Sequence, residues 1–409
     1  MKSYGAYLKH VLTCAPAPRS ERISVEAAAG RVLLEDIRAT IDDPVEARSA
    51  MDGYAVHARD LRDAGWDSPM WLAESGRSQA GRTPRLRLAV GTAWRIMTGA
   101  PMPDGADAVV PVEYVTRIGG RVRFVAAPKR GAYVRRPREN FRRGALLIRA
   151  GAVMRAQELG LAITAGYKTL RVARRLRVGV VSTGDELVAA GSRLRRGEVF
   201  DSNRPTILAM ARDAGVLAID LGCVGDRPEF LDRVLKEHRR ELDMLVTIGG
   251  VSAGDFDVVK VFLRRYRSVE LVKVGMRPAK PQAFGRIGRL WWYGLPGNPV
   301  SAMIAFDRFV RPFVMRATGH RLVFRAQRTG VCEMSVGKKH TLREFIRAHA
   351  RQAGDIWRVR PVGPGGSSNI RSMVNANALI ILPERCQRVA AGEDVAFELL
   401  ADPPLRTVP

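Results

Sequence analysis

From residue 174 to residue 319 the chain alternates short apolar runs with glycine- or aspartate-containing turns and helical spacing. The apolar runs read RVGVVS, LAIDLGCV, DMLVTI and LWWYG. Helices are expected near residues 205–214, near residues 229–239 and for about a dozen residues from Val300. Such alternation is typical of βαβ units, in which parallel strands form a sheet with helices on both faces. The pattern therefore predicts an α/β domain.

Two other stretches have short apolar or alternating runs that are broken by glycine and proline. Within residues 42–132 these runs read RLRLAV, WRIMTG, DAVVPVEYV and RVRFVAA, and within residues 320–409 they read CEMSV, DIWRVRPV, ALIILPE and DVAFELL. Several short strands between turn residues indicate β domains. We expect a small β-rich module in the first stretch and a β-barrel or sandwich in the second.

Helical spacing covers residues 4–41 and returns at residues 156–165, on the other side of the β-rich module. Apolar residues recur there three and four positions apart, as on one face of a helix. This order suggests that the module is an insertion, and that its flanks, residues 1–41 and 133–173, belong to one domain.

Composition narrows the classes of function. The chain has 409 residues, of which 46% are hydrophobic, enough to bury real cores and to exclude disorder as the main state. Its 67 basic and 41 acidic residues give a net charge of +26. The basic residues are spread over the whole chain, and their densest stretch, Arg117–Arg143, has aromatic residues only at Phe124, Tyr133 and Phe141, without the run of interleaved aromatic residues of a single-strand binder. We therefore expect no nucleic-acid partner.

The four cysteines lie far apart in the sequence, at positions 14, 223, 332 and 386. This spacing supports neither a disulfide framework nor a thiolate zinc site, so a cytoplasmic protein is expected. Apolar runs are shorter than a membrane span requires, and lysine, proline and arginine interrupt the beginning of the chain. We expect no signal segment and no membrane partner.

Candidate chemistry gathers in three loops that follow apolar strands: residues 183–186 (TGDE), 249–255 (GGVSAGD) and 295–299 (LPGNP). Ligands bind at the carboxyl ends of the strands in open parallel sheets, and glycine amides with helix N-termini favour phosphate. An ordinary tight turn remains the alternative for each loop alone. The candidate substrate-binding residues in these loops are Gly184, Asp185, Gly249, Gly250, Ser252, Gly254, Asp255, Pro296, Gly297 and Asn298.

Charged residues near these loops suggest two further functions. Glu186, Asp226 and Asp257 fall at strand ends, where carboxylates bind a hard cation such as magnesium or, alternatively, cap helices. Arg277 and Lys280 are each followed by proline in MRPAKPQAFG, so two cations on a stiff segment could bind a small oxyanion. A solvated basic turn is the alternative for this pair.

Eight motifs, in one order along nearly the whole chain, resemble those of the molybdopterin molybdenumtransferase family, which is similar to the E domain of gephyrin. They read SAMDGYAV, RIMTGAPMPDGADAVVP, TGDEL, DSNR, GGVSAGDFD, MRPAKPQAFG, LPGNPVSA and GGSSNIRSMVNANALIILPE. The resemblance implies an α/β multidomain fold. Its parts would be a split helical domain (1–41 plus 133–173), an inserted β domain (42–132), a molybdopterin-binding-like α/β/α domain with a parallel sheet (174–319) and a C-terminal β-barrel (320–409).

The activity that the resemblance implies is insertion of molybdenum from molybdate into adenylylated molybdopterin, with release of AMP and with Mg²⁺ as cofactor. It further implies a homodimer, and as possible partners the upstream adenylyltransferase and apo-molybdoenzymes. Asp52 and Thr98 would line a cleft opposite the α/β domain of the partner subunit, although a plain turn also explains the MDGYA segment. The implied catalytic residues are Asp52, Thr98, Glu186, Asp226, Asp257 and Lys280. Glu186, Asp226 and Asp257 would also bind the metal, while Lys280, Arg277 and Ser368 would bind molybdate and phosphate.

Two departures from the family pattern stand out. Ala145 and Leu146 occupy positions where a Glu-Asp pair is usual, and Arg277 replaces a usual lysine. Arginine is planar and bulkier than lysine, so the two are not interchangeable at a shaped oxyanion site. The alternative function is therefore a non-catalytic paralogue that binds molybdopterin or its adenylyl form as a carrier or scaffold.

Overall fold

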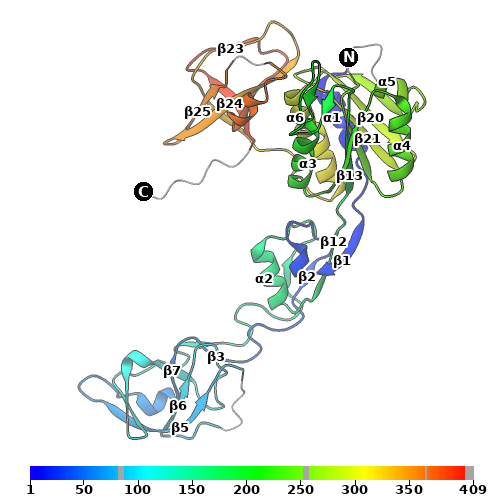
Figure 1. Ribbon diagram of the computed structural model, residues 1–409. Coiled ribbons are helices and arrows are strands. Elements are labelled where there is room, and N and C mark those ends of the chain that lie inside the picture. Colours follow the sequence, from blue (N-terminus) through cyan, green and yellow to red (C-terminus); the bar gives the residue numbers. More distant parts are fainter. Residues whose placement is uncertain (82–86, 252–257, 364–365, 401–409) are drawn as a thin grey trace. The chain divides into compact units, whose positions relative to one another are not determined.

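The computed structural model describes residues 1–81, 87–251, 258–363 and 366–400 (Figure 1). The chain divides into two compact units. The first contains residues 1–21, 30–34 and 172 onward, and the second contains residues 22–29 and 35–171.

The first unit is built on a six-stranded sheet with strand order β16-β13-β17-β21-β20-β18. The first four of these strands are parallel to one another. Strand β20 runs antiparallel to β21, and β18 runs antiparallel to β20. The predicted parallel sheet is therefore confirmed for four strands, while β18 and β20 extend it beyond the prediction. The bounds are β13 Arg177–Thr183, β16 Leu217–Val224, β17 Met244–Ile248, β18 Val269–Lys273, β20 Pro281–Ile287 and β21 Leu290–Leu295.

Helices bury apolar side chains against the two faces of this sheet in separate clusters. Helices α1, α3, α6 and α7 contribute to one cluster, and α4 and α5 to the other. In α4 the buried residues Leu231, Val234 and Leu235 follow the spacing of one helix face. The helix bounds are α1 Tyr4–Thr13, α3 Asn203–Asp213, α4 Pro228–His238, α5 Val258–Leu263, α6 Pro299–Ala305 and α7 Arg311–Ala317. A π-helical turn, residues 306–310, joins α6 to α7.

The helix predicted over residues 4–41 is confirmed only for α1, so the rest of that prediction is wrong. Pro16 and Pro18 follow α1, and proline cannot continue a helix. Residues 20–24 form strand β1, and residues 26–28 form a short 3₁₀ turn. The apolar spacing beyond α1 is therefore produced by a strand and turns.

A closed barrel forms the C-terminal part of the first unit. Its five strands pair in the order β24-β25-β22-β28-β26, and β26 pairs back to β24. This confirms the predicted barrel. The strand expected at CEMSV is wrong, because residues 333–335 form a bend and only Cys332 and Val336 lie in strands, and strands β22 and β24 were not predicted. The strand bounds are β22 Gln327–Cys332, β24 Arg343–Ala353, β25 Ile356–Pro361, β26 Ala378–Leu382 and β28 Asp394–Leu399. The smaller elements are β23 Val336–Gly337, α8 Arg371–Val374 and β27 Arg388–Val389.

The second unit contains a six-stranded sheet with the order β7-β4-β6-β5-β9-β8. The strand expected at RLRLAV is wrong for residues 87–90, which form a loop with Leu88 buried, while residues 85–86 lie outside the described residues. The sheet bounds are β4 Gly53–Val56, β5 Met70–Ser78, β6 Thr92–Ile96, β7 Ala108–Pro111, β8 Val115–Ile118 and β9 Arg121–Phe124.

Short strand pairs and one helix complete the second unit. Helix α2, Ala156–Thr164, agrees with the predicted return of helical spacing. Strand β2 (Ile37–Arg38) pairs with β11 (Leu146–Ile148), and β3 (Arg48–Ser49) pairs with β10 (Val134–Arg135). Strand β12, Thr169–Ala173, pairs with β1, Ser20–Ser24. No helix in the described part of the chain is long and apolar enough to cross a membrane.

Candidate active site

The carboxyl ends of β13, β17 and β21 meet at one edge of the sheet, because these strands are parallel neighbours. A cavity of about 700 Å³ lies there, between the loops that leave the three strands. This arrangement brings the predicted loops together, as expected for an open parallel sheet. The predicted site residues that line this loop cavity are Gly184, Glu186, Asp226, Gly249, Gly250, Pro296, Gly297, Asn298 and Ser368.

Other predicted residues of these loops do not line the loop cavity. The backbone N–H of Asp226 donates to Asp185 Oδ1 at 3.0 Å, and that of Asp185 donates to Asp226 Oδ2 at 3.3 Å. Asp185 therefore connects the loop after β13 to the loop after β16 through these two hydrogen bonds. The remaining predicted residues of the second loop, Ser252, Gly254, Asp255 and Asp257, lie outside the described residues.

Three acidic residues, Glu186, Asp201 and Asp226, line the loop cavity. The Glu186 carboxylate lies against Gly184, where an added Cβ would come within 2.5 Å of Glu186 Oε2. The flexible Glu186 side chain could move away from an added Cβ, but Gly184 also has a φ of +152°, a backbone conformation that favours glycine. Among the described residues no three acidic, histidine or cysteine side chains gather as a metal-ligand group. Of the three carboxylates, that of Asp201 is buried and engaged by Ser182 and Arg204, so those of Glu186 and Asp226 are the candidate metal ligands among the described residues.

The loop between β15 (Val199–Phe200) and α3 supplies residues that the sequence did not single out. Asp201 is buried, and its Oδ1 accepts from Ser182 Oγ at 3.0 Å and from the backbone N–H of Arg204 at 3.1 Å. Asn203 Nδ2 donates to the carbonyl of Gly297 at 2.6 Å. These bonds connect the DSNR segment to the ends of β13 and β21. The signal in the sequence was the DSNR motif itself.

A second cavity, of about 590 Å³, adjoins the loop cavity, because Ser301 borders both. Arg277 and Lys280 line it, as does Arg347 of strand β24. Asn298 Nδ2 donates to Ser367 Oγ at 3.1 Å and so connects the loop cavity to this cationic cavity. Glu344 is the acidic member of its lining. The cationic cavity therefore collects three cations beside the loop cavity.

Arg347 is the buried cation of this group and was missed by the sequence analysis. Its exposed fraction is 6%, and its Nε donates to Ser372 Oγ at 3.1 Å. Burial lowers the pKa of its guanidinium, and nearby Glu344 opposes that effect. Because arginine stays protonated even so, Arg347 carries a charge that few solvent molecules screen. The sequence signal was weak, since REFIRAHARQA does not alternate as a typical strand.

Backbone geometry aims Arg277 and Lys280 into the cationic cavity. Ala279, between them, has a φ of +74°, a left-handed conformation that costs an alanine about 1–2 kcal/mol. The Ala279 carbonyl accepts from Gln282 Nε2 at 2.7 Å, and buried Gln282 also accepts from the Tyr293 hydroxyl. Strand β19, Met276–Arg277, pairs with β24 and places Arg277 opposite Glu344. The surrounding structure thus holds a strained turn in place.

The predicted pair Asp52 and Thr98 lies in the second unit. Both the backbone N–H and the hydroxyl of Thr98 donate to Asp52 Oδ1, at 2.6 and 2.7 Å. These two hydrogen bonds lower the pKa of the Asp52 carboxyl. The two motifs thus meet in the structure. The prediction that Asp52 and Thr98 line a cleft opposite a partner's α/β domain stays a prediction.

Three family models match the chain in order along its length. They are described as MoeA N-terminal region (domain I and II), Probable molybdopterin binding domain and MoeA C-terminal region (domain IV), over residues 3–166, 179–316 and 329–400. A relative named molybdopterin molybdenumtransferase 2, from Mycobacterium tuberculosis, is 38% identical over 96% of this chain and 98% of its own. The chain belongs to the molybdopterin molybdenumtransferase family.

Further relatives of this family agree with the assignment. The molybdopterin molybdenumtransferase of Haemophilus influenzae is 34% identical over 93% of this chain and 94% of its own. A crystal structure of a molybdopterin biosynthesis MoeA protein from Pyrococcus horikoshii is 28% identical, has a TM-score of 0.80, and covers 97% of this chain and 98% of that one. The fold is therefore that of the family.

The positions that depart from the family pattern have structural roles in this molybdopterin molybdenumtransferase family member. Ala145 accepts at its carbonyl from the backbone N–H of Ala39 at 2.9 Å. Leu146 begins β11 opposite Arg38 and is half-buried. Both residues lie in the second unit, where they support the pairing of β11 with β2.

Proposed function

We propose that this chain inserts molybdenum from molybdate into adenylylated molybdopterin and releases AMP. The adjoining pair of cavities carries the proposal. Backbone amides of the glycine-containing loops suit an adenylyl phosphate, while the cationic cavity suits a small dianion such as molybdate. Ser301 borders both cavities, so the two substrates would meet beside it.

Two anionic substrates repel each other unless the protein supplies compensating charge. Arg277, Lys280 and Arg347 supply it on the molybdate side. The loop cavity also has an apolar wall, formed by Leu187, Val199 and Phe200, which suits the flat rings of an adenylylated pterin. Water attacks the phosphate anhydride, so that AMP leaves and the pterin keeps its own phosphate; the two dithiolene thiols bind molybdenum, and one molybdate oxygen leaves as water with the two thiol protons. Positioning and fixed charges therefore supply most of the catalysis.

Magnesium is part of the proposed reaction. Glu186 and Asp226 fit this ion, which proteins hold through one or two carboxylates together with substrate phosphate oxygens. When bound, it would neutralise charge on those oxygens. Asp257, proposed as a third ligand, lies outside the described residues.

The proposal includes a cytoplasmic homodimer. All four cysteines are free, in keeping with a reducing compartment. The family resemblance suggests the dimer, in which Asp52 and Thr98 would face the α/β domain of the other subunit. The upstream adenylyltransferase and apo-molybdoenzymes are proposed as further partners.

The direct test is AMP release from adenylylated molybdopterin by the purified protein. We expect release that requires both molybdate and Mg²⁺, measured by chromatography in parallel reactions that each omit one component. Tight binding of the adenylylated pterin with no AMP release under any of these conditions would contradict the transferase function. It would instead support the alternative function, a non-catalytic carrier of molybdopterin or its adenylyl form.

Restoring the usual acids with Ala145→Glu and Leu146→Asp should change the rate of AMP release less than about threefold. These positions support a strand pair, and no described contact connects them to the two cavities. The rate should be compared with that of Ile163→Glu, which adds an acid at an exposed position of α2 in the same unit. A large gain in rate for the double variant alone would show that the native chain has a degenerate site.

A further inference from the structure

A third cavity, of about 740 Å³, lies at the edge of the sheet opposite the candidate active site. Its lining comes from the segments that lead into β13, β17 and β21, and these parallel strands all begin at this edge. Strand β13 has seven residues, so at ~3.3 Å per residue the two edges are roughly 20 Å apart. The arginine pocket, as we call it, is therefore separate from the loop and cationic cavities. Its charged residues are Arg19, Arg174, Arg177, Arg239, Arg240, Glu241, Asp243 and Arg289.

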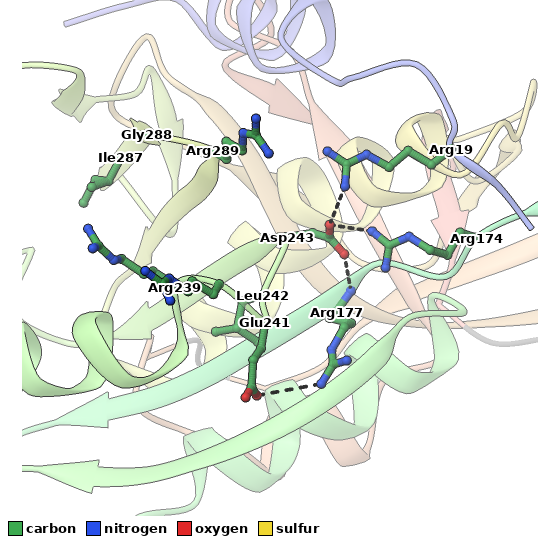
Figure 2. Close-up of a pocket in the computed structure, with 11 residues that line it drawn as sticks. Arg19, Arg174, Arg177, Arg239, Glu241, Leu242, Asp243, Ile287, Gly288 and Arg289 are labelled. Carbon is green, nitrogen blue, oxygen red and sulfur yellow. Dashed lines mark hydrogen bonds and ion pairs between the residues drawn. The ribbon is translucent and has the colours of Figure 1, made fainter.

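The two acids in the arginine pocket are already engaged by part of the arginines (Figure 2). Asp243 accepts from Arg174 Nη2 at 2.6 Å, and from the backbone N–H of Arg177 at 2.8 Å. Its Oδ1 also lies 3.8 Å from Arg19 Nη1, and Glu241 lies 3.8 Å from the Arg177 guanidinium. These contacts hold three guanidinium groups around the wall of the pocket.

The other three arginines have no such compensation. Within the described part of the chain, no hydrogen bond or ion pair engages the side chains of Arg239, Arg240 and Arg289, and all three are exposed. Figure 2 likewise draws no dashed line to Arg239 or Arg289. In addition, Arg177 Nε is buried without a hydrogen-bond partner among those residues. Six arginines against two acids leave the pocket with four uncompensated positive charges.

The charge of the chain as a whole does not explain this arrangement. Most of its arginines are scattered, whereas these six converge on one concavity from segments up to 270 residues apart in sequence. Like charges repel, so gathering them without acids is unfavourable unless an anion binds there. Guanidinium groups pair with phosphate oxygens in a fork, and the cavity has the size of a small-molecule site.

We propose that the arginine pocket binds a polyphosphate group, either free pyrophosphate or the phosphate chain of a nucleoside triphosphate. Either group carries three to four negative charges near neutral pH, which matches the uncompensated charge. The side chains of Leu242 and Ile287 add apolar wall beside the arginines. This site is independent of the proposed transferase reaction.

Titration calorimetry of the full-length protein with pyrophosphate, at 0.15 M salt, tests the proposal. We expect one saturable site whose affinity falls as salt is raised, because the arginines are solvent-exposed. The double variant Arg239→Ala with Arg289→Ala should bind at least about tenfold more weakly, since two charge-assisted contacts are lost. Neither side chain has an internal partner, so the melting temperature should not change; if it does, the single variant Arg240→Ala replaces the pair.

The matched control is the double variant Arg358→Ala with Arg360→Ala, which removes two exposed arginines of the barrel. Its affinity for pyrophosphate should stay within about twofold of that of the native protein. Pyrophosphate could also enter the cationic cavity, so the titration is repeated with Arg347→Ala; binding at the arginine pocket should persist in this variant and should still be weakened by Arg239→Ala with Arg289→Ala. Tighter binding of ATP than of pyrophosphate would assign the pocket to nucleotides, and equal binding would assign it to the polyphosphate group alone.

Three results would overturn the proposal. One is the absence of pyrophosphate binding up to millimolar concentration. Another is equal weakening by the barrel control, which would indicate a general effect of net charge. The last is preferential binding of a hexaglutamate peptide, which would indicate an acidic protein segment as the occupant.

Discussion

Replacing Arg347 with alanine is expected to lower molybdate-dependent AMP release by about 100-fold or more. Arg347 is the buried cation of the cationic cavity, where low solvent access makes a fixed charge most effective. Removing one preorganised group that stabilises developing charge costs about 10²–10³ in rate in well-studied enzymes. Loss of this cation should also raise the KM for molybdate.

The control for this variant is Arg351→Ala, on the same strand β24. Arg351 is exposed and pairs with Glu333 at 2.9 Å, outside the cavities. The rate of AMP release by the Arg351→Ala variant should stay within about twofold of the native rate, because exposed ion pairs contribute little to stability. Initial rates over a range of molybdate concentrations measure both variants. An unchanged molybdate dependence in a folded Arg347→Ala protein would show that molybdate binds elsewhere.

Replacing Asp307 with alanine is expected to destabilise the first unit by about 3–5 kcal/mol. Asp307 is buried and accepts from Arg308 Nε and Arg325 Nε, each at 2.9 Å. Arg308 also donates to Glu398 of the barrel at 2.6 Å. Removing one member of a buried ion pair leaves an uncompensated buried charge, which strongly destabilises the folded protein. Urea denaturation followed by tryptophan fluorescence measures the loss.

The same carboxylate should make stability depend on pH. Burial by itself raises the pKa of Asp307, but Arg308 and Arg325 more than reverse this, so its pKa lies below the usual 3.8. The stabilisation is therefore complete above about pH 4 and is lost as pH falls through the lowered pKa. The difference in the free energy of unfolding between the native protein and Asp307→Ala should shrink as the pH falls through that range. The control is Asp394→Ala, at an exposed position of β28, which should lower the free energy of unfolding by less than about 0.5 kcal/mol. A similar loss of stability in both variants would show that the buried ion pairs of Asp307 are not the cause.

The sequence predicted the loop cavity well because its residues follow from one rule. Parallel strands end at a common edge, so recognising the apolar runs before Gly184, Gly249 and Pro296 was enough to bring their loops together. The barrel was predicted for a similar reason, since three of its five strands, β25, β26 and β28, are short apolar runs between turns. Local patterns thus determine most of the fold that positions the site.

Sites that depend on tertiary contacts could not be predicted in this way. Strand β24 is partly buried and carries three arginines and one histidine, so its sequence did not indicate a strand, and Arg347 was missed with it. Helix α1 was predicted, but nothing local showed that Tyr4 and Tyr7 pack in the core beside Phe309. The arginine pocket combines single residues from distant segments, which no motif describes.

The pairing of β19 with β24 also bears on how this family can vary in length. Main-chain hydrogen bonds between β19 and β24, two neighbouring strands of one sheet, fix Arg277 opposite Glu344, and Arg347 follows on the same strand β24. Inserting or deleting one residue between Arg343 and Arg347 would turn Arg347 to the opposite face of its strand, while point substitutions there would leave the spacing intact. This stretch should therefore tolerate exchange of residues far better than changes in their number, because the number of residues sets which face of β24 carries Arg347.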